Sequence, residues 1–218
     1  MILIISNKWD ITVDFVVREL KLRNHPFLRL NTEDLIKEKC SLSLNPLSIK
    51  VTKNGIDYDL TESTRVIWNR RPGKPYDDLP KAEKPSDAIE GYVDNQWYAW
   101  VEAFQLLQNV IWINHPHANG LTENKARQLQ LAADIGFRIP DTLISNDPKA
   151  IRSFFEGHGN RIVAKALYSP LIEEPEQDYF IFSNLINSLP HDCDDELRAA
   201  PSIYQEAFLP KIDYRVTV

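Results

Sequence analysis

The chain has 218 residues, of which 43% are hydrophobic and 26% are charged, and its formal net charge is −6. This length allows one large domain or two small ones, and the negative charge does not indicate a nucleic-acid partner. No apolar run approaches the ~20 residues of a membrane-spanning helix, and Cys40 and Cys193 are far apart in polar surroundings, which argues against a disulfide framework. We therefore expect a cytoplasmic protein with free thiols and with neither a membrane nor a nucleic acid as partner.

The beginning of the chain predicts a parallel sheet. Residues 2–6 form an apolar run typical of a buried strand, and residues 26–31 resemble a second strand. Between them, Asp10 is placed to cap a helix over 11–24. A strand, a helix and a strand in this order form a βαβ unit, which favours parallel pairing. A short helix over 31–39 is expected to follow.

The next stretch continues the α/β pattern. Asn54-Gly55, in the middle of residues 47–60, is a strong hairpin signal because both residue types tolerate a positive φ. The further expected elements up to residue 120 are a strand at 64–72, a helix over 86–108, a strand at 110–114 and a loop at 115–120.

The sequence changes character near residues 118–124, and we place a boundary there between domains 1–118 and 119–218. The second domain predicts a smaller α+β arrangement, in which Gly136 is suited to ending the first helix. The expected elements are a helix over 123–137, a strand at 139–146, a helix over 147–158, strands at 161–167 and 179–186, a loop or short acidic helix over 187–201, and strands within 204–218, the last of them an alternating run at 212–218.

Several common kinds of site are not indicated. The loop that follows the first strand contains no glycine, although a dinucleotide pyrophosphate turn needs glycines, and the chain has no P-loop. His115 and His117 have no cysteine or carboxylate nearby at ligand spacing, so a structural role in the loop is favoured over metal binding. No serine or cysteine is set in a pattern typical of a hydrolase nucleophile.

Two lysines are more informative. Lys125 lies in the first turn of an expected helix, and Lys165 lies in an expected strand between apolar neighbours. By itself Lys165 is typical of an edge residue whose ammonium reaches solvent. Two ammonium groups that converge on one triphosphate would each gain on the order of several kcal/mol at an effective dielectric near ~20.

Taken in order, the motifs of the chain resemble the ATP-grasp fold, most closely its peptide-maturing branch, the graspetide or microviridin-type macrocyclases. The motifs are Trp-Asn-Arg-Arg-Pro at 68–72, Trp-Ile-Asn-His-Pro at 112–116, Asn-Lys at 124–125 followed by Ala, Gly and Pro-x-Thr, Val-Ala-Lys at 163–165, Tyr-Gln-Glu-Ala-Phe at 204–208 and Asp-x-Arg-Val-x-Val at 213–218. The resemblance implies an α/β protein with a Rossmann-like pre-ATP-grasp domain, followed by a small α+β ATP-grasp lobe that is incomplete at the C-terminus.

The resemblance also implies roles for individual residues. ATP and Mg²⁺ are the expected cofactors, with the phosphates on Lys125 and Lys165. The other implied roles are adenine binding by Gln205, Glu206, Ala207 and Phe208, catalysis by Arg215, and binding of the substrate by Arg70 and Arg71. Four of these residues have a plainer alternative: a core position for Phe208, an ion pair with Asp213 for Arg215, and surface salt bridges for Arg70 and Arg71.

The activity implied by the resemblance is an ATP-dependent ligase that activates side-chain carboxylates of a ribosomal precursor peptide as acyl phosphates. A hydroxyl or an amine would then attack to form an ester or an amide. The leader of the peptide would dock near residues 166–186, where an acidic cluster could meet it or could be a solvated turn. A homodimer is compatible with the family, and the family's metal ligands are expected beyond Val218, so the chain as given is expected to be inactive.

Two other functions stay open at this point. One is a non-catalytic module that binds a leader peptide and has no metal site. The other is an ATP-grasp ligase that adds amino acids to a protein or forms a small peptide.

Overall fold

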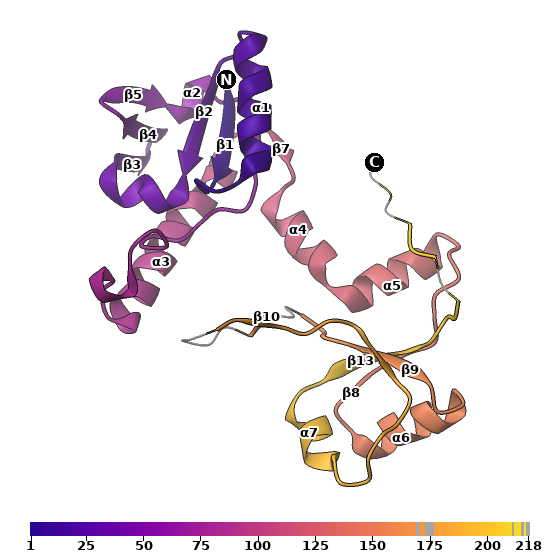
Figure 1. Ribbon diagram of the computed structural model, residues 1–218. Coiled ribbons are helices and arrows are strands. Elements are labelled where there is room, and N and C mark those ends of the chain that lie inside the picture. The colour runs from indigo at the N-terminus through magenta and orange to yellow at the C-terminus, as the bar shows by residue number, and fades with distance from the viewer. Residues whose placement is uncertain (169–170, 173–176, 211, 215, 217–218) are drawn as a thin grey trace. The chain divides into compact units, whose positions relative to one another are not determined.

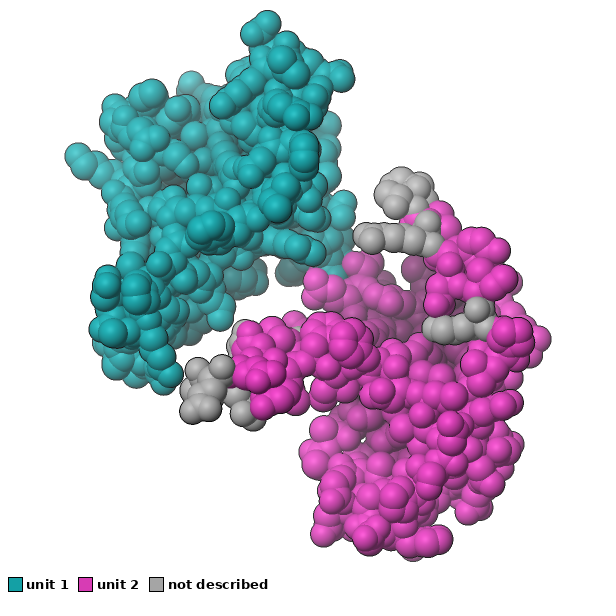
Figure 2. Space-filling model, in the orientation of Figure 1, with its two compact units in different colours: residues 1–119 teal, residues 120–218 magenta. Residues whose placement is uncertain are grey.

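The computed structural model describes residues 1–168, 171–172, 177–210, 212–214 and 216. The chain divides into two compact units, residues 1–119 and 120–218, which Figure 2 shows in teal and magenta. Each unit has a hydrophobic core of its own. None of the helices in the described part of the chain is long and apolar enough to cross a membrane.

A parallel sheet of four strands organises unit 1, in the order β2-β1-β6-β7. Figure 1 labels β1, β2 and β7 of this sheet. The strands are β1 (Ile2–Ser6), β2 (Phe27–Asn31), β6 (Val66–Asn69) and β7 (Ile111–Ile113). Leu3 of β1 lies opposite Leu28 on one side and Ile67 on the other. The predicted strands and their parallel pairing are confirmed.

One face of this sheet is covered by a second, antiparallel sheet of three strands in the order β3-β4-β5. Its elements are β3 (Lys39–Leu44), β4 (Leu47–Lys53) and β5 (Ile56–Asp59), and α2 (Leu60–Ser63) follows directly. The predicted turn between β4 and β5 is confirmed, with φ of 51° at Asn54 and 77° at Gly55. Ile49 and Val51 of β4 pack into the core with Leu3 and Leu30 of the parallel sheet.

The helix α1 (Ile11–Leu22) packs against the parallel sheet through Val13, which is fully buried, as is Ile4 of β1. Asp10 caps this helix as predicted, because its Oδ1 accepts hydrogen bonds from the backbone N–H groups of Thr12 and Val13 at 2.9 and 3.2 Å. Both faces of the parallel sheet are therefore occupied by packed elements, which is typical of parallel sheets.

Two predictions for unit 1 need correction. The short helix expected over 31–39 is present as a 3-10 helix, η1 (Thr32–Lys37), but strand β3, which was not predicted, begins at Lys39. In β3, serines alternate with Cys40, Leu42 and Leu44, but no β-branched or aromatic residue is present, so the sequence signal for a strand is weak. The loop expected at 115–120 is instead the start of a helix, α4 (Pro116–Glu123). Proline is compatible with a first helical position, where no N–H is needed.

The remaining helical elements of unit 1 lie between β6 and β7. They are η2 (Lys81–Glu83), α3 (Asp87–Glu102) and η3 (Ala103–Leu106). The helix predicted over 86–108 is thus confirmed, with its last turn in 3-10 form. Phe104 of η3 is fully buried in the core, and Trp100 of α3 packs edge-on against it with ring centroids 4.8 Å apart.

Unit 2 is built on an antiparallel sheet of four strands in the order β12-β9-β13-β8. The strands are β8 (Thr142–Ser145), β9 (Ile162–Lys165), β12 (Asn184–Ile186) and β13 (Ser202–Glu206). Two helices, α6 (Pro148–Gly157) and α7 (Asp194–Ala199), complete the packed layer below it in Figure 1. Their core with the sheet consists of Ile151, Phe155, Ile162 and Tyr204.

The other elements of unit 2 are α5 (Lys125–Asp134) and a two-stranded hairpin of β10 (Leu171–Ile172) and β11 (Tyr179–Phe180). Gly136 ends the helix region as predicted, with φ of 93°. The strand predicted at 179–186 is two separate strands, β11 and β12.

The strand predicted at 212–218 is not found in the described residues 212–214 and 216, which are exposed and carry no strand. Alternation predicts a strand only where a sheet edge is within reach, and the described part of this segment pairs with no sheet edge.

Candidate functional site

The sheet of unit 2 has a second face that carries polar groups. Side chains alternate along a strand, so the residues on either side of Ile162, Ala164 and Tyr204 point away from the helices. Register places Val163, Lys165, Ile203, Gln205 and Leu185 together on this face, which we call the lysine face. A cavity of about 630 Å³ is lined by most of these residues and by the segment that follows β13.

Lys165 is held on this face by a chain of hydrogen bonds. Its Nζ donates to Oε1 of Gln205 at 2.6 Å, and Nε2 of Gln205 donates to Oγ1 of Thr142 at 2.9 Å. Oγ1 of Thr142 in turn donates to the carbonyl of Pro140 at 2.8 Å. Gln205 is only 5% exposed, so the amide is fixed on both sides and the ammonium is oriented toward the cavity.

Lys125 is brought to the end of β9 from another element. Asn124 caps α5 through its Oδ1, which accepts from the N–H of Arg127 at 3.0 Å, and this cap makes Lys125 the first residue of the helix. Nζ of Lys125 donates to the carbonyls of Ala166 and Tyr168 at 2.5 and 3.0 Å. Ala166 directly follows Lys165, so the structure brings both predicted lysines to one strand end.

The segment after β13 lines the same cavity. Glu206 continues the sheet, since its N–H donates to the carbonyl of Asp141 at 2.9 Å, and Ala207 and Phe208 follow along the cavity wall. Phe208 is 43% exposed and the guanidinium of Arg138 lies 5.8 Å from its ring centroid. The alternative of a core phenylalanine is therefore wrong.

A titratable residue near this segment was not predicted from the sequence. The pKa of His158 is raised, first by the hydrogen bond between its Nδ1 and the carbonyl of Phe154 at 2.8 Å, and further by the carboxylate of Asp141. The charge of Glu206 acts in the same direction. A lone histidine after a helix gives no sequence signal that its pKa will be raised.

The predicted substrate arginines lie in unit 1, directly after β6. Nε of Arg70 donates to Oδ2 of Asp10 at 3.1 Å, and the side chain of Asp10 is only 4% exposed. Arg71 is exposed, has φ of 48°, and its carbonyl accepts a hydrogen bond from the side chain of Asn7. The ion pair expected as the plainer alternative is thus present for Arg70. The remaining predicted site residue, Arg215, lies outside the described residues.

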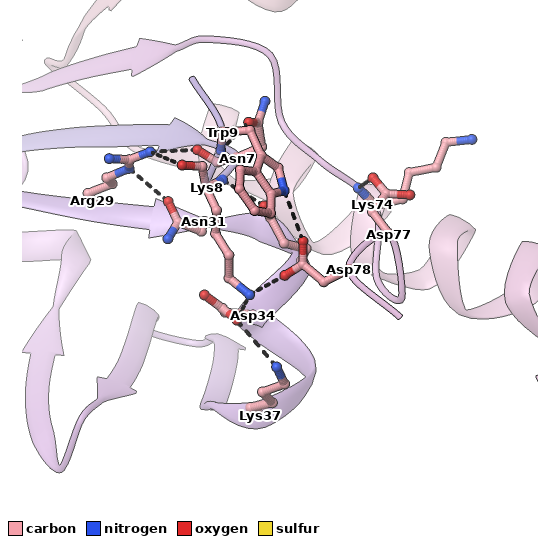
Figure 3. A network of polar contacts seen from close by, with 11 residues as sticks. Asn7, Lys8, Trp9, Arg29, Asn31, Asp34, Lys37, Lys74, Asp77 and Asp78 are labelled. Atoms are coloured by element: carbon pink, nitrogen blue, oxygen red, sulfur yellow. Dashed lines mark hydrogen bonds and ion pairs between the residues drawn. The ribbon is translucent and has the colours of Figure 1, made fainter. Parts of the chain in front are cut away.

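A polar network surrounds the ends of β1 and β2 (Figure 3). The ammonium of Lys8 lies between Asp34 and Asp78 and pairs with both carboxylates. These hydrogen bonds, with that of Asp34 the strongest, raise the pKa of Lys8, and Lys8 holds the pKa of Asp78 below its usual range. The network therefore ties the loop after β6 to the end of β1.

Metal ligands do not gather in the part of the chain that the structure describes. No group of three or more His, Cys, Asp or Glu side chains is placed there to hold an ion. The rings of His115 and His117 lie 6.1 Å apart, and that of His115 also packs on Trp112 at 5.3 Å.

Comparison with known proteins gives the fold a name. No protein-family profile and no curated protein matches the chain. Among solved structures, macrocyclase MdnC from Microcystis aeruginosa MRC, bound with precursor peptide MdnA, is similar over 94% of this chain and 67% of its own, with a TM-score of 0.80 and 20% identity.

A RiPP-associated ATP-grasp ligase from Chryseobacterium gregarium, in complex with ADP and a leader and core peptide, is similar over 94% of this chain and 62% of its own, with a TM-score of 0.79 and 23% identity. ATP-grasp ligase PsnB, complexed with minimal precursor, Mg and ADP, is similar over 94% and 63%, with a TM-score of 0.72 and 22% identity. The chain thus spans about two thirds of the length of these structures. It has the fold of the RiPP-associated ATP-grasp ligases.

Proposed function

We propose that this chain serves an ATP-dependent ligase that activates side-chain carboxylates of a ribosomal precursor peptide. Unit 1 is then the pre-ATP-grasp domain, and unit 2 belongs to the ATP-grasp lobes. In such a ligase, the γ-phosphoryl group of ATP is transferred to a carboxylate, which gives an acyl phosphate and ADP. A hydroxyl or amine then displaces phosphate to give an ester or an amide. The observation that carries the proposal is that Lys125 and Lys165 meet at the end of β9: Nζ of Lys125 donates to the carbonyl of Ala166, and the neighbouring Lys165 lines a cavity of about 630 Å³.

The lysine face fits an adenine nucleotide chemically. The cavity lies within the ~300–1,000 Å³ range typical of small-molecule sites. Its lining includes Lys165, whose ammonium can bind phosphate as a point charge, and the chain segment of Glu206 and Ala207. We assign phosphate binding to Lys125 and Lys165 and adenine binding to residues 205–208, with Arg215 as the catalytic residue near the acyl phosphate.

Gln205 has a positioning role in this proposal. Because its side-chain oxygen binds the ammonium of Lys165 and its nitrogen binds Thr142, it orients the lysine before a ligand arrives. Among the described residues, no group of three or more carboxylate, histidine or cysteine side chains is placed to hold Mg²⁺.

A surface for the peptide is offered by the hairpin of unit 2. Side chains on and after β10 and β11 are large, apolar and between 42% and 70% exposed, namely Leu171, Ile172, Tyr179, Phe180, Ile181 and Phe182. Exposed apolar groups that are contiguous in this way mark binding surfaces in soluble proteins. We propose that the leader of the peptide docks here. Of the acidic cluster predicted in this region, Asp178 is described and Glu173, Glu174 and Glu176 lie outside the described residues.

The nucleotide site is tested by calorimetric titration of ADP into the chain and into three variants. In Lys165→Ala the affinity for ADP should fall at least about tenfold, because a charge-assisted contact is worth ~1.5–3 kcal/mol. Lys149→Ala, which removes an exposed ammonium from α6 on the other side of the sheet, is the matched control and should bind normally. Glu206→Ala should weaken ADP more than it weakens pyrophosphate.

The results of these titrations distinguish a nucleotide-binding ligase from a module that binds only a leader peptide. Equal losses of ADP and pyrophosphate in Glu206→Ala would contradict the adenine assignment. Loss of the folded state in Lys165→Ala, seen by circular dichroism, would contradict the phosphate role. If the wild-type chain binds a precursor peptide but no ADP, the non-catalytic leader-binding module becomes the better account.

A further inference from the structure

Unit 1 contains a cavity of about 500 Å³ that the proposed function does not use. It lies at the carboxyl ends of β1 and β6, where Ile5 and Asn69 reach it. In the sheet, β2 lies on one side of β1, and β6 and β7 lie on the other side. The strand order therefore reverses between β1 and β6, at the position of the cavity. Open α/β sheets bind ligands at this position.

The walls of the cavity are mostly apolar and aromatic. Trp97 and Val101 come from α3, Trp112 from β7, and Pro75, which is buried, from the loop after β6. The residues of α3 that line it recur every three or four positions, so one side of the helix forms a wall. An apolar body of the size of an aromatic ring fits such walls, and tryptophan faces also attract cations.

Two polar atoms in the lining stand out because they are acceptors without a donor. Oδ1 of Asn69 and Oδ1 of Asp94 are buried, and neither has a hydrogen-bond partner among the described residues. A buried acceptor left unpaired costs roughly as much as a lost hydrogen bond, and a carboxylate oxygen costs more. A ligand that donates hydrogen bonds here would remove that cost.

The charges of the lining also favour a ligand that donates hydrogen bonds. The cavity is lined by two carboxylates, Asp94 and Glu102, and by one ammonium, Lys74. Glu102 already accepts a hydrogen bond from the hydroxyl of Tyr98 at 3.0 Å, whereas Oδ1 of Asp94 has no donor in the described part of the chain. Burial raises the pKa of Asp94, as expected for a carboxyl group whose charge is poorly compensated.

The wall formed by the loop after β6 is held in place before any ligand arrives. Oγ1 of Thr32 donates to the carbonyl of Gly73 at 2.6 Å, and Nδ2 of Asn7 donates to the carbonyl of Arg71 at 2.7 Å. The same loop contains Asp78, which Lys8 binds in the network of Figure 3. A preformed wall reduces the ordering cost of binding.

We propose that this cavity binds a primary ammonium carried on an apolar or aromatic body, with the ammonium donating to Asp94 and Asn69 and the body between Trp97, Val101 and Trp112. An alcohol of the same shape would fill the walls without supplying the charge. A carboxylate of the same shape would be repelled by Asp94. The site is complete within unit 1, so it stands independently of the nucleotide site of unit 2.

The test titrates 2-phenylethylamine and 2-phenylethanol into the full chain slightly above neutral pH, followed by tryptophan fluorescence and by calorimetry. The amine should bind about tenfold more tightly than the alcohol, because one charge-assisted hydrogen bond gives a difference of that order. Asp94→Asn keeps the shape of the side chain and should reduce the difference to within about twofold. Asp87→Asn removes an exposed carboxylate from the same helix and should leave the difference in affinity between the amine and the alcohol unchanged.

A second variant fills the cavity instead of changing its charge. A Cβ added at Gly91, which lines the cavity, would meet no atom within 4 Å, so Gly91→Leu can extend into the space without a clash at its base. It should lose both ligands while circular dichroism stays native. The proposal is overturned if amine and alcohol bind equally, if Asp94→Asn keeps the preference, or if folded Gly91→Leu binds the amine like the wild type.

Discussion

The two sheets of this protein place their polar groups in different positions. In unit 1 both faces of the parallel sheet are covered, by α1 and by the β3–β5 sheet, and the polar side chain that could meet a ligand, Asn69, lies at the last position of β6. In unit 2 the helices α6 and α7 cover one face, and Lys165 and Gln205 project from the strands themselves. A sheet face without a helix layer thus lets a polar side chain from within a strand, that of Gln205, line a cavity, whereas the covered sheet of unit 1 reaches its cavity only at the strand ends.

The sharpest way to break this comparison is a pair of substitutions on the two faces of the unit 2 sheet. Ile162→Ala empties a fully buried position on the covered face and should lower the free energy of unfolding of unit 2 by about 2–5 kcal/mol. Leu185→Ala changes β12 on the lysine face, where the side chain is 43% exposed, and should cost less than about 1 kcal/mol.

The two units can be followed separately in this experiment. All five tryptophans lie in unit 1, so their fluorescence reports unit 1 alone, while hydrogen exchange of peptides from 120–218 reports unit 2. The loss for Ile162→Ala should appear only in the second signal. Equal losses for the two variants would show that the lysine face is packed as firmly as the covered face.

A second pair of substitutions concerns the edge of the unit 1 sheet. Arg70→Ala should destabilise unit 1 by about 1–2 kcal/mol, because it leaves Oδ2 of the buried Asp10 without its ion-pair partner. Arg71→Ala should change stability by less than about 0.5 kcal/mol, because that side chain is exposed. Urea unfolding followed by tryptophan fluorescence measures both.

The same pair also separates a structural role from a binding role. If Arg70→Ala is as stable as the wild type, the ion pair with Asp10 contributes nothing, and binding of a substrate becomes the better reason for an arginine at this position. If Arg71→Ala loses affinity for a precursor peptide without any loss of stability, the substrate role inferred from the sequence gains support at Arg71.

Much of the fold was predictable from local signals. The βαβ start, the Asn54-Gly55 turn and the helix end at Gly136 depend on residues that act within a few positions of themselves. The strand at Lys39–Leu44 and the absence of one in the described part of 212–218 depend on what a segment packs against, which no local pattern contains. Alternation by itself cannot tell a strand from an exposed segment.

The candidate sites divide in the same way. Lys125 and Lys165 could be named because a lysine among apolar neighbours is costly and a helix start is recognisable. The hydrogen bonds of Lys165 to Gln205 and of Gln205 to Thr142 join strands far apart in the chain, so only the register of the sheet reveals them. Asp94, whose Oδ1 has no partner among the described residues, could not be found, because an aspartate in a helix is ordinarily a solvent-facing residue.

The smallest effect that we expect is a pH dependence of the stability of unit 2, and it concerns the face of the sheet that the helices cover. His158 follows α6 and contacts Asp141 just before β8, so it links the helix layer to the sheet edge. Its pKa is raised in the folded state, first by the carbonyl of Phe154, relative to an ordinary value near ~6.5 in the unfolded chain. The folded state therefore binds the proton more tightly, and the resulting stability is present below about pH 6.5 and lost as pH rises through the raised pKa.

His158→Gln should remove this dependence. The wild-type advantage in urea unfolding, measured by circular dichroism, should be under about 1 kcal/mol at pH ~5.5, since the contacts lie near the surface, and should shrink by pH ~8.5. An NMR titration of the His158 ring should give a pKa above that of a model peptide. An advantage that stays constant across this range would mean that the neutral ring, through its hydrogen bond to Phe154, already supplies the link between α6 and the sheet, and that the carboxylate of Asp141 adds nothing to it.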